Sequence, residues 1–421
     1  MKVLFITLVA IVWMLGSASA HAENVLEELV GQALERHPQI TAAAARWQGL
    51  QQRVEAAGAL ADPRLTLGVR SLPVGDPLDF RQDPMTQKVV GISQLIPYRG
   101  KLGARADQAR HEAEAARWLI EERKLELAQM VRETGYRIYA VAKSIELTRQ
   151  NLVLLDDLIA LAETRYAVGE GSMQEALEAQ VRRSGMQNRL VEFKQQQRSL
   201  QALMNELTVN RQGTPIFTVD LEPPVTDLGE SDDLTARALA VRPLLHSLAA
   251  EHQARLSSRR LAELDYYPDT TLNVEYQQRD TLNSGMTGVG GNDLYSLMLS
   301  FNLPVQRDRR RAVEQERIAE GAQVAARLQQ AKISIERGIV QSLAEVDQRV
   351  EQATLYREAI IPQAEQALEA SVAAYQVGRL DFSQVLQQQL DLFDYRITYH
   401  RLVADYYITL ARLRTLVGGE L

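Results

Sequence analysis

Cysteine is absent from all 421 residues of this chain. The absence excludes disulfide bonds, thiolate metal sites, a cysteine nucleophile and an acylated N-terminal cysteine. Any attachment to a membrane must therefore come from the fold itself. Aromatic residues make up only 6% of the sequence, which argues against one thick globular core.

Long apolar runs are missing after the first residues. Lys2 is a short basic start, residues 3–15 are apolar, and Ala20-His21-Ala22 has the small-x-small pattern of a cleavage site, with Ala18-Ser19-Ala20 as an alternative. Residues 1–22 are therefore predicted to be a secretory signal peptide. The run is too short to anchor the chain, and no later segment approaches ~18 uninterrupted apolar residues. We expect the mature protein to be exported.

Charge of either sign is not in large excess. The formal net charge is −7, and it becomes about −8 when the predicted signal, with its single Lys2, is removed. A mildly acidic exported chain is a poor partner for nucleic acid, so none is expected.

The sequence repeats itself at an offset of about 205 to 209 residues. Tyr166-Ala167-Val168-Gly169 returns as Tyr375-Gln376-Val377-Gly378, and Ser93-Gln94-Leu95-Ile96-Pro97 returns as Ser300-Phe301-Asn302-Leu303-Pro304. Ala33 to Pro38 is echoed by Ala238 to Pro243. We predict a first structural repeat over 23–215, a proline-containing linker over 216–229 and a second repeat over 230–421.

Each half begins with a helical pattern and then two strand patterns. The helical patterns cover 23–61 and 232–266, and each ends at a proline, Pro63 or Pro268, which suits an extended segment. Apolar and polar residues alternate in the strand patterns, although the second is less regular; they cover 65–70, 88–96, 272–277 and 295–303. The stretches 72–87 and 279–293 are rich in Gly or Pro and are predicted to be loops.

A long helical hairpin follows in each half. Residues 101–168 contain no proline and would extend ~100 Å as a helix. The corresponding run, 308–377, is as long, but Pro362 should kink it. Glycines then break both runs, and helices are predicted to return over 173–207 and 382–417. Small residues at heptad-like spacing predict close helix packing.

The four strands leave two unpaired edges, so one chain cannot close a barrel. Membrane-spanning strands must close, because lipid offers no partner for edge amides. If these strands span a membrane, several chains share one barrel of eight, twelve or sixteen strands. The alternative is two surface hairpins on a soluble protein, since alternation also describes half-buried soluble strands.

The duplicated Tyr-x-Val-Gly turns, the strand-to-helix prolines and the Asp62-Pro63 step resemble the TolC-like outer membrane efflux protein family over residues 23–417. The resemblance implies a mainly α fold with a small β part. Long helical hairpins would form a periplasmic tunnel, and four transmembrane strands per chain would complete a 12-stranded barrel in a homotrimer. It implies a periplasmic adaptor, an inner-membrane pump and outer membrane lipid as partners.

A narrower resemblance rests on residues 75–77, 83–86 and 90–94. This stretch is similar to the heavy-metal efflux branch associated with resistance-nodulation-division (RND) pumps, which implies passive export of metal cations. Two rival hypotheses are a periplasmic adaptor, which normally has one hairpin, and a soluble coiled-coil scaffold.

The resemblance also implies a gate at the periplasmic end, where helix contacts keep the channel shut and acidic side chains select cations. By position it assigns Tyr375 and Glu175 to this constriction, with Gln174 beside the acid. This sequence departs from the family pattern at three positions. Two positions that are acidic in the family are occupied by Gln384 and Gln387, and one that is basic is occupied by Leu380, which precedes Asp381. A ring of carboxylates in a narrow pore favours cations, and the two neutral positions leave this ring with fewer negative charges. The simpler alternative is that Tyr375 only packs the hairpin end and Glu175 is a solvated helix-start acid.

The turns between the long helices are the predicted adaptor contacts. Gly169 and Gly378 should end their helices with positive φ, and Tyr166, Gly171 and Arg379 lie beside them. The histidines form no i,i+4 pair or ligand cluster, and no phosphate loop, nucleophile elbow or catalytic carboxylate pair is present. No cofactor, resident metal or enzymatic activity is expected.

Overall fold

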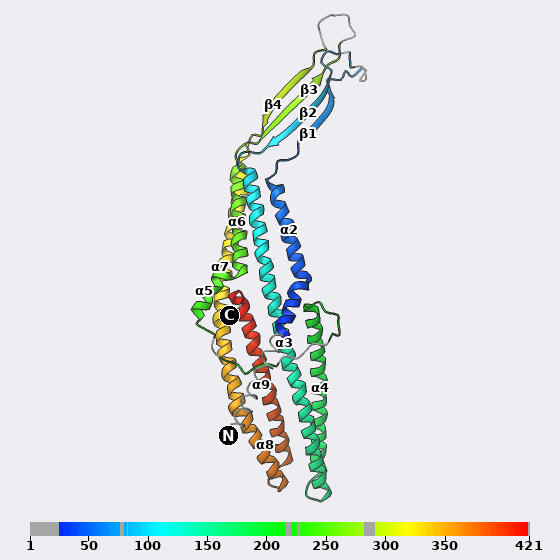
Figure 1. The fold of residues 1–421 in the computed structure, drawn as a ribbon, viewed down its shortest axis with the longest axis vertical. Helices are drawn as coiled ribbons and strands as arrows, with labels where there is room; N and C mark the ends of the chain where they lie inside the picture. Colours follow the sequence, from blue (N-terminus) through cyan, green and yellow to red (C-terminus); the bar gives the residue numbers. More distant parts are fainter. Residues whose placement is uncertain are drawn as a thin grey trace, which may run out of the picture. The chain divides into compact units, whose positions relative to one another are not determined.

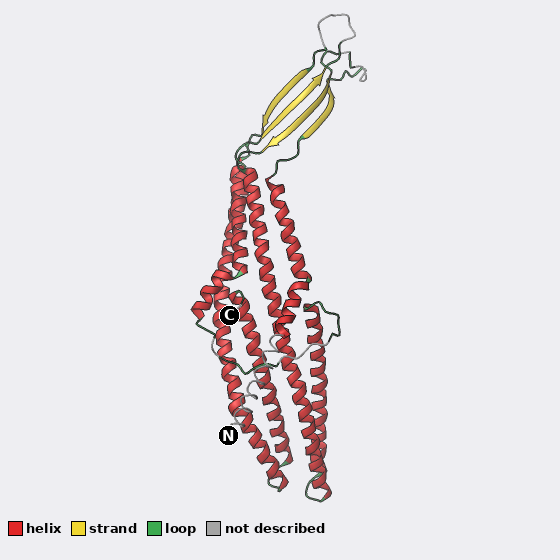
Figure 2. Cartoon of the chain, in the orientation of Figure 1, coloured by secondary structure: helices red, strands yellow, loops and turns green. Residues whose placement is uncertain are grey.

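The computed structural model describes residues 25–419 except 76–79, 82, 215–219, 226–227 and 282–290. The predicted signal peptide, parts of the linker at 216–229 and the centres of both strand-connecting loops lie outside the described residues. The described chain is mainly helical with one small sheet, which confirms the predicted fold class (Figure 2). The chain forms two compact units. The first unit comprises the described parts of Met1–Ala43, Leu119–Leu244 and Ala331–Leu421. The second unit comprises the described parts of Ala44–Trp118 and Leu245–Gln330.

The sheet lies entirely in the second unit. Its strands are β1 (Arg64–Arg70), β2 (Gln87–Ile96), β3 (Thr270–Gln278) and β4 (Leu294–Phe301), in the antiparallel order β1-β2-β3-β4 (Figure 1). All four coincide with predicted strands to within a few residues. The β2–β3 pairing joins the strand pairs of the two halves and leaves β1 and β4 as edges within the chain.

The strand register separates an apolar face from a polar one. Leu65, Ile92, Val274 and Leu297 stand in register across the sheet and are between 46% and 73% exposed. The neighbouring row is Thr66, Gly91, Glu275 and Ser296. Because successive side chains point to opposite faces, one face is apolar and exposed while the other carries polar groups.

A glycine in the polar row permits a close side-chain approach. A Cβ on Gly91 would lie 2.9 Å from Cγ of Glu275, which is too close for a carbon contact. The Glu275 carboxylate instead passes over the glycine and accepts a hydrogen bond from Arg70 at 3.0 Å (Nη2–Oε2).

Two helical patterns predicted as continuous are each broken by a proline. Residues 25–36 are helical, His37 is not, and α2 spans Pro38–Gly58. In the second half, α5 (Ser231–Val241) gives way to α6 (Pro243–Leu264). The predictions of single helices over 23–61 and 232–266 are therefore wrong. Proline disfavours helical ψ in the residue before it, and Arg242 has an extended ψ of 119°.

The long helices follow the predicted bounds closely. They are α3 (Lys101–Ala167), α4 (Met173–Leu207), α7 (Arg307–Leu355), α8 (Ile361–Gln376) and α9 (Phe382–Val417). A π-helical turn, Tyr356–Ile360, separates α7 from α8, and Pro362 lies in the first turn of α8. Regular α-helix is thus interrupted where Pro362 predicts a kink, because proline cannot donate the i→i−4 hydrogen bond.

Two apolar clusters hold the first unit together. One joins residues of the 25–36 helix with α3, α4 and α9 around Leu26, Val131 and Met204. The other joins α3, α4, α8 and α9 and includes Tyr375, Phe382 and Leu386. Ala162, Ala176 and Ala179 of the second cluster are fully buried, so these small residues allow close helix approach.

None of the described helices has the length and apolar character that crossing a membrane requires.

Candidate functional site

The two turns that connect the long helices have the same backbone geometry. After α3, Gly169 has φ +79°, its N–H donates to the Tyr166 carbonyl, and the Glu170 N–H donates to the Arg165 carbonyl. After α8, Gly378 has φ +71° and the equivalent bonds run to Tyr375 and Ala374. Both are Schellman motifs, which need a left-handed residue after the helix. The predicted positive φ of the two glycines is confirmed.

Tyr375 links the two hairpins beside these turns. It is only 2% exposed, and its hydroxyl donates to the Glu175 carboxylate at 2.6 Å (Oη–Oε2). Glu175 lies in the first turn of α4, in the first half of the chain, whereas Tyr375 ends α8 in the second half. The two residues that the resemblance assigns to the constriction therefore contact each other directly.

Arg165 holds Tyr375 from the opposite side. Its guanidinium lies over the Tyr375 ring, 4.5 Å from the centroid, and donates to the Tyr375 carbonyl. It also donates to the Glu170 carbonyl at 3.1 Å (Nη2–O). Phe382 packs against the same ring at a centroid distance of 5.1 Å. Arg165, Glu175, Tyr375 and Phe382 form what we call the tip cluster.

The electrostatics of the tip cluster keep the Tyr375 hydroxyl protonated. Burial, with a further contribution from the hydrogen bond to Glu175, raises the pKa of Tyr375 to about 12, and the nearby Arg165 only partly opposes this shift. The Tyr375 hydroxyl thus remains protonated, and so a hydrogen-bond donor, at every physiological pH.

The other residues predicted at the constriction do not join the tip cluster. Gln174, Asp381, Gln384 and Gln387 are exposed. Asp381 is the N-cap residue of α9, but its side chain makes no capping hydrogen bond. The Gln387 amide donates to the Asp391 carboxylate at 2.7 Å (Nε2–Oδ1).

The predicted adaptor-contact residues are distributed around the two turns. Tyr166 is 52% exposed, and Gly169, Gly378 and Arg379 are also exposed. Gly171 is partly buried, and a Cβ there would lie 3.2 Å from Cβ of Arg165 and 3.3 Å from Oε2 of Glu175. Any side chain at Gly171 would therefore press on the tip cluster.

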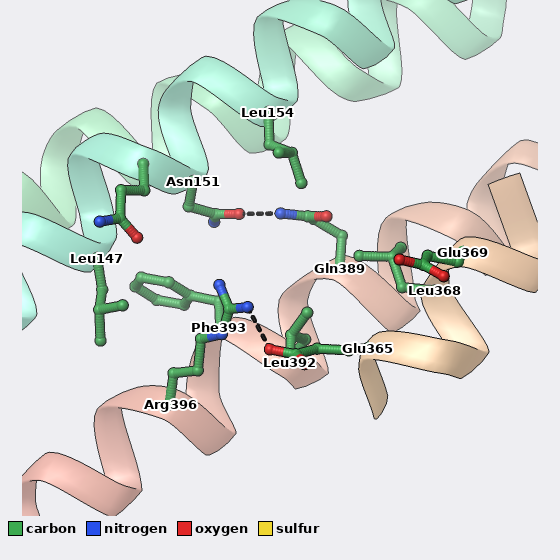
Figure 3. A pocket seen from close by; sticks show the side chains of 11 residues that line it. Leu147, Asn151, Leu154, Glu365, Leu368, Glu369, Gln389, Leu392, Phe393 and Arg396 are labelled. Atoms are coloured by element: carbon green, nitrogen blue, oxygen red, sulfur yellow. Dashed lines mark hydrogen bonds and ion pairs between the residues drawn. The ribbon is translucent and has the colours of Figure 1, made fainter. Parts of the chain in front are cut away.

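A cavity of about 370 Å³ lies between α3, α8 and α9 (Figure 3). Asn151 of α3 and Gln389 of α9 face each other across it and are hydrogen bonded through their amides. On another wall, Arg396 donates to Glu365, which links α9 to α8. Leu154, Leu368 and Phe393 supply apolar surface.

The buried Asn151–Gln389 amide pair has one polar atom on each side chain that makes no hydrogen bond within the described part of the chain. Asn151 and Gln389 are each 4% exposed, yet Asn151 Nδ2 and Gln389 Oε1 have no partner.

Sequence reasoning missed Arg165 and the Asn151–Gln389 pair. Arg165 could have been noticed, because the repeat places Ala374 at its equivalent position and the two tips therefore differ in charge. For the amide pair no comparable signal exists, since the two residues are far apart in sequence and belong to different halves. In the described part of the chain, no group of three His, Asp or Glu side chains could hold a metal ion.

Residues 29–207 and 234–419 match the family described as outer membrane efflux protein. The chain belongs to this family. The predicted resemblance to TolC-like efflux proteins is confirmed, and the match covers both halves of the duplicated sequence. The protein is thus an outer membrane efflux channel, and the alternatives of an adaptor or a soluble scaffold are wrong.

One relative and two solved structures show how far the similarity extends. The chain is 21% identical over 332 residues to the cobalt-zinc-cadmium resistance protein CzcC of Cupriavidus metallidurans, covering 77% of this chain and 75% of that protein. The outer membrane protein VceC of Vibrio cholerae has a TM-score of 0.77 at 18% identity, covering 94% of this chain and 96% of that one. A membrane protein from Pseudomonas aeruginosa has a TM-score of 0.80 at 19% identity, covering 94% of this chain and 90% of that one.

Proposed function

We propose that this efflux channel conducts heavy-metal cations passively, as the outer membrane part of a tripartite system with a periplasmic adaptor and an RND pump. The observation that carries the metal assignment is the similarity to CzcC, whose name states resistance to cobalt, zinc and cadmium. The channel itself need not bind the metal tightly, because a conduit must also release its cargo. No catalytic step is part of this proposal.

The assembly we propose is a homotrimer. Each chain offers four strands with β1 and β4 unpaired at the edges, so several copies must pair edge to edge to close a barrel. Three copies give twelve strands, an even number in the range of known barrels. In each copy the two repeats, 23–215 and 230–421, supply one strand pair and one helical hairpin, joined by the linker at 216–229.

The tip cluster is our candidate for the gate. Tyr375 and Glu175 tie the two hairpins together at their turns. Gln174, Asp381, Gln384 and Gln387 are exposed nearby on α4 and α9 and are proposed to face the passing cation. Tyr166, Gly169, Gly171, Gly378 and Arg379 at the turns are proposed as the adaptor contact. The second hairpin is proposed to move on opening, because the π-helical turn and the Pro362 region interrupt it.

Metal specificity is tested by deleting the gene in its host. Growth should be inhibited at lower concentrations of cobalt, zinc, cadmium, copper or silver, whereas sensitivity to a panel of hydrophobic drugs should change little. Complementation with the intact gene should restore growth. The metal assignment would be wrong if the deletion strain became sensitive only to the drugs.

A further inference from the structure

Exposed arginines gather where the strands give way to helices at one end of the sheet. β2 ends at Ile96 and α3 begins at Lys101, while β4 ends at Phe301 and α7 begins at Arg307 (Figure 1). Arg99 lies in the first connection, and Arg307, Arg309 and Arg311 open α7; all four are exposed. We call these four residues the basic band. Residues 305–311 alone carry a net charge of +3.

The basic band has little compensation from carboxylates of its own chain. Among the described residues, no ion pair within 4.0 Å involves Arg99, Arg307 or Arg309. Arg311 approaches Asp308 at 3.7 Å, but these side chains are 70% and 98% exposed. Such a pair contributes little, because water screens it.

Three neighbouring carboxylates in the same unit are already engaged elsewhere. Asp265 and Asp269 lie 3.0 and 2.9 Å from Nζ of Lys101, whose side chain is only 3% exposed. The Glu314 carboxylate accepts the Tyr266 hydroxyl at 3.0 Å. Cations in the first turn of α7 also oppose the helix dipole. The basic band is therefore a positive surface that an external anion would stabilise.

Apolar and aromatic groups lie beside the basic band. Leu303 and Val305, in the connection from β4 to α7, are 75% and 77% exposed. Tyr98 and Tyr267 stack with ring centroids 4.5 Å apart, and both are more than one-third exposed. Along a line from the acyl chains of a bilayer to its headgroups, a membrane protein is expected to expose apolar side chains first, then tyrosines and then arginines.

We propose that the basic band binds the phosphate groups of anionic phospholipids in the periplasmic leaflet of the outer membrane. Arg99 follows the last residue of β2 by three positions, so its backbone lies at most about 10 Å beyond the strand. The headgroup layer on each side of a bilayer is about 5–7 Å thick, and a long arginine side chain can reach back into it. The exposed apolar row of the strands, which includes Leu65, Ile92 and Leu297, would face lipid in the proposed barrel, and the basic band lies at the end of that surface.

The test uses the purified full-length channel in neutral detergent, titrated with phosphatidylglycerol or phosphatidylcholine and followed by native mass spectrometry. The wild type should bind phosphatidylglycerol at least tenfold more tightly than phosphatidylcholine, since each arginine near anionic lipid contributes appreciably. Arg307→Gln, Arg309→Gln and Arg311→Gln combined should abolish this preference, and the three Arg→Lys changes should keep it. The preference should fall as salt concentration rises.

A matched control removes the same charge elsewhere in the second unit. Arg46→Gln, Arg53→Gln and Arg327→Gln combined alter exposed arginines on α2 and α7 away from the strand connections, and lipid preference should stay unchanged. Inorganic phosphate at equal concentration should not displace the lipid. Displacement by phosphate, equal binding of the two lipids by wild type, or unchanged preference in the Arg→Gln triple variant would each overturn the proposal. Loss of subunit association in that variant would instead assign the basic band to contacts between copies and would also overturn it.

Discussion

At the scale of single residues, the tip cluster concentrates several interactions on one side chain. Tyr375 is packed by Phe382, covered by Arg165 and hydrogen bonded to Glu175. A buried hydrogen bond to a charged acceptor contributes about 1.5–3 kcal/mol, and its loss leaves a carboxylate without its partner. The polar contact between the hairpins beside their turns therefore depends on few atoms.

Tyr375→Phe combined with Glu175→Gln should raise the single-channel conductance in planar bilayers. The substitutions remove the hydroxyl and the charge that join the hairpins, while most of the packing volume stays. Tyr166→Phe is a matched control, because Tyr166 holds the equivalent place in the first repeat but is 52% exposed. Equal conductance and equal blockade by divalent cations in the double variant and the wild type would remove these two residues from the gate.

His400 should make the stability of the protein depend on pH. Burial, helped by the nearby Lys143 and opposed by Glu146 and Asp220, lowers the pKa of His400 from 6.5 to about 4. The neutral ring shares a hydrogen bond with the Tyr139 hydroxyl at 2.9 Å (Nδ1–Oη). The unfolded chain binds a proton below pH 6.5 that the folded chain does not accept until about pH 4, so stability is lost as pH falls through this window.

The expected loss between pH 7 and pH 4 is about 3 kcal/mol per chain. Apparent unfolding temperatures in detergent, followed by circular dichroism, would measure it. His400→Gln should flatten the dependence, because an amide oxygen can still accept the tyrosine hydroxyl but does not titrate. An equally steep decline in the variant would assign the effect to other groups.

At the scale of elements, the break between α5 and α6 is fixed by a buried ion pair. Arg242, just before Pro243, donates twice to the Glu122 carboxylate, at 2.6 Å (Nη2–Oε1) and 3.0 Å (Nε–Oε2). The same carboxylate accepts the Leu244 N–H at 3.2 Å. Both side chains of the pair are less than one-tenth exposed. Glu122 thus caps the N-terminus of α6 and neutralises the arginine at once.

Arg242→Met should lower the free energy of unfolding by about 3–5 kcal/mol, since it leaves the Glu122 charge buried alone. Adding Glu122→Leu should recover most of this loss, because the unpaired charge is then gone. Thermal unfolding of the two variants beside the wild type would measure the difference. If the single variant were as stable as the double one, the ion pair would not be the element that holds this break.

The sequence was sufficient to predict most elements but few of their contacts. Strand alternation and glycine turns placed β1 to β4 and the bounds of α4 and α9 well, because these signals are local. The breaks at Pro38 and Pro243 were missed as the surrounding patterns stay helical, although each proline satisfies the rule for a helix start. The tip cluster was found only in part. Tyr375 and Glu175 were assigned by position from the family resemblance, whereas Arg165 reaches Tyr375 through a contact that local sequence does not reveal.

The basic band could not be predicted from the sequence either. Arg99 and Arg307 lie in different halves, and the overall charge of the chain is negative. Only the pairing of β2 with β3 brings the two connections to one end of one sheet.

At the scale of the whole molecule, the proposed trimer should be the smallest stable form in detergent. Multi-angle light scattering or native mass spectrometry should give a mass of three chains, because a single chain leaves the backbone of β1 and β4 unpaired. Replacing Leu67 on β1 with Pro should shift the mass towards the monomer, since proline cannot donate a ladder hydrogen bond. The same change at Val74, beyond the end of β1, should leave the mass unchanged. A wild-type mass of two or four chains would contradict the proposed assembly.

The two unpaired edge strands also have a consequence for assembly, because the number of channels formed should depend on how fast the chain is synthesised. In the proposed trimer a chain cannot complete the barrel until it meets two others, so the rate of productive insertion should rise more steeply than the rate of synthesis. Chains made too slowly should then persist as monomers with the apolar surface of their strands exposed, and we expect proteases to remove them. Halving the gene dosage should therefore lower the number of channels by more than half, and a chain with one defective edge should act dominantly over the normal one.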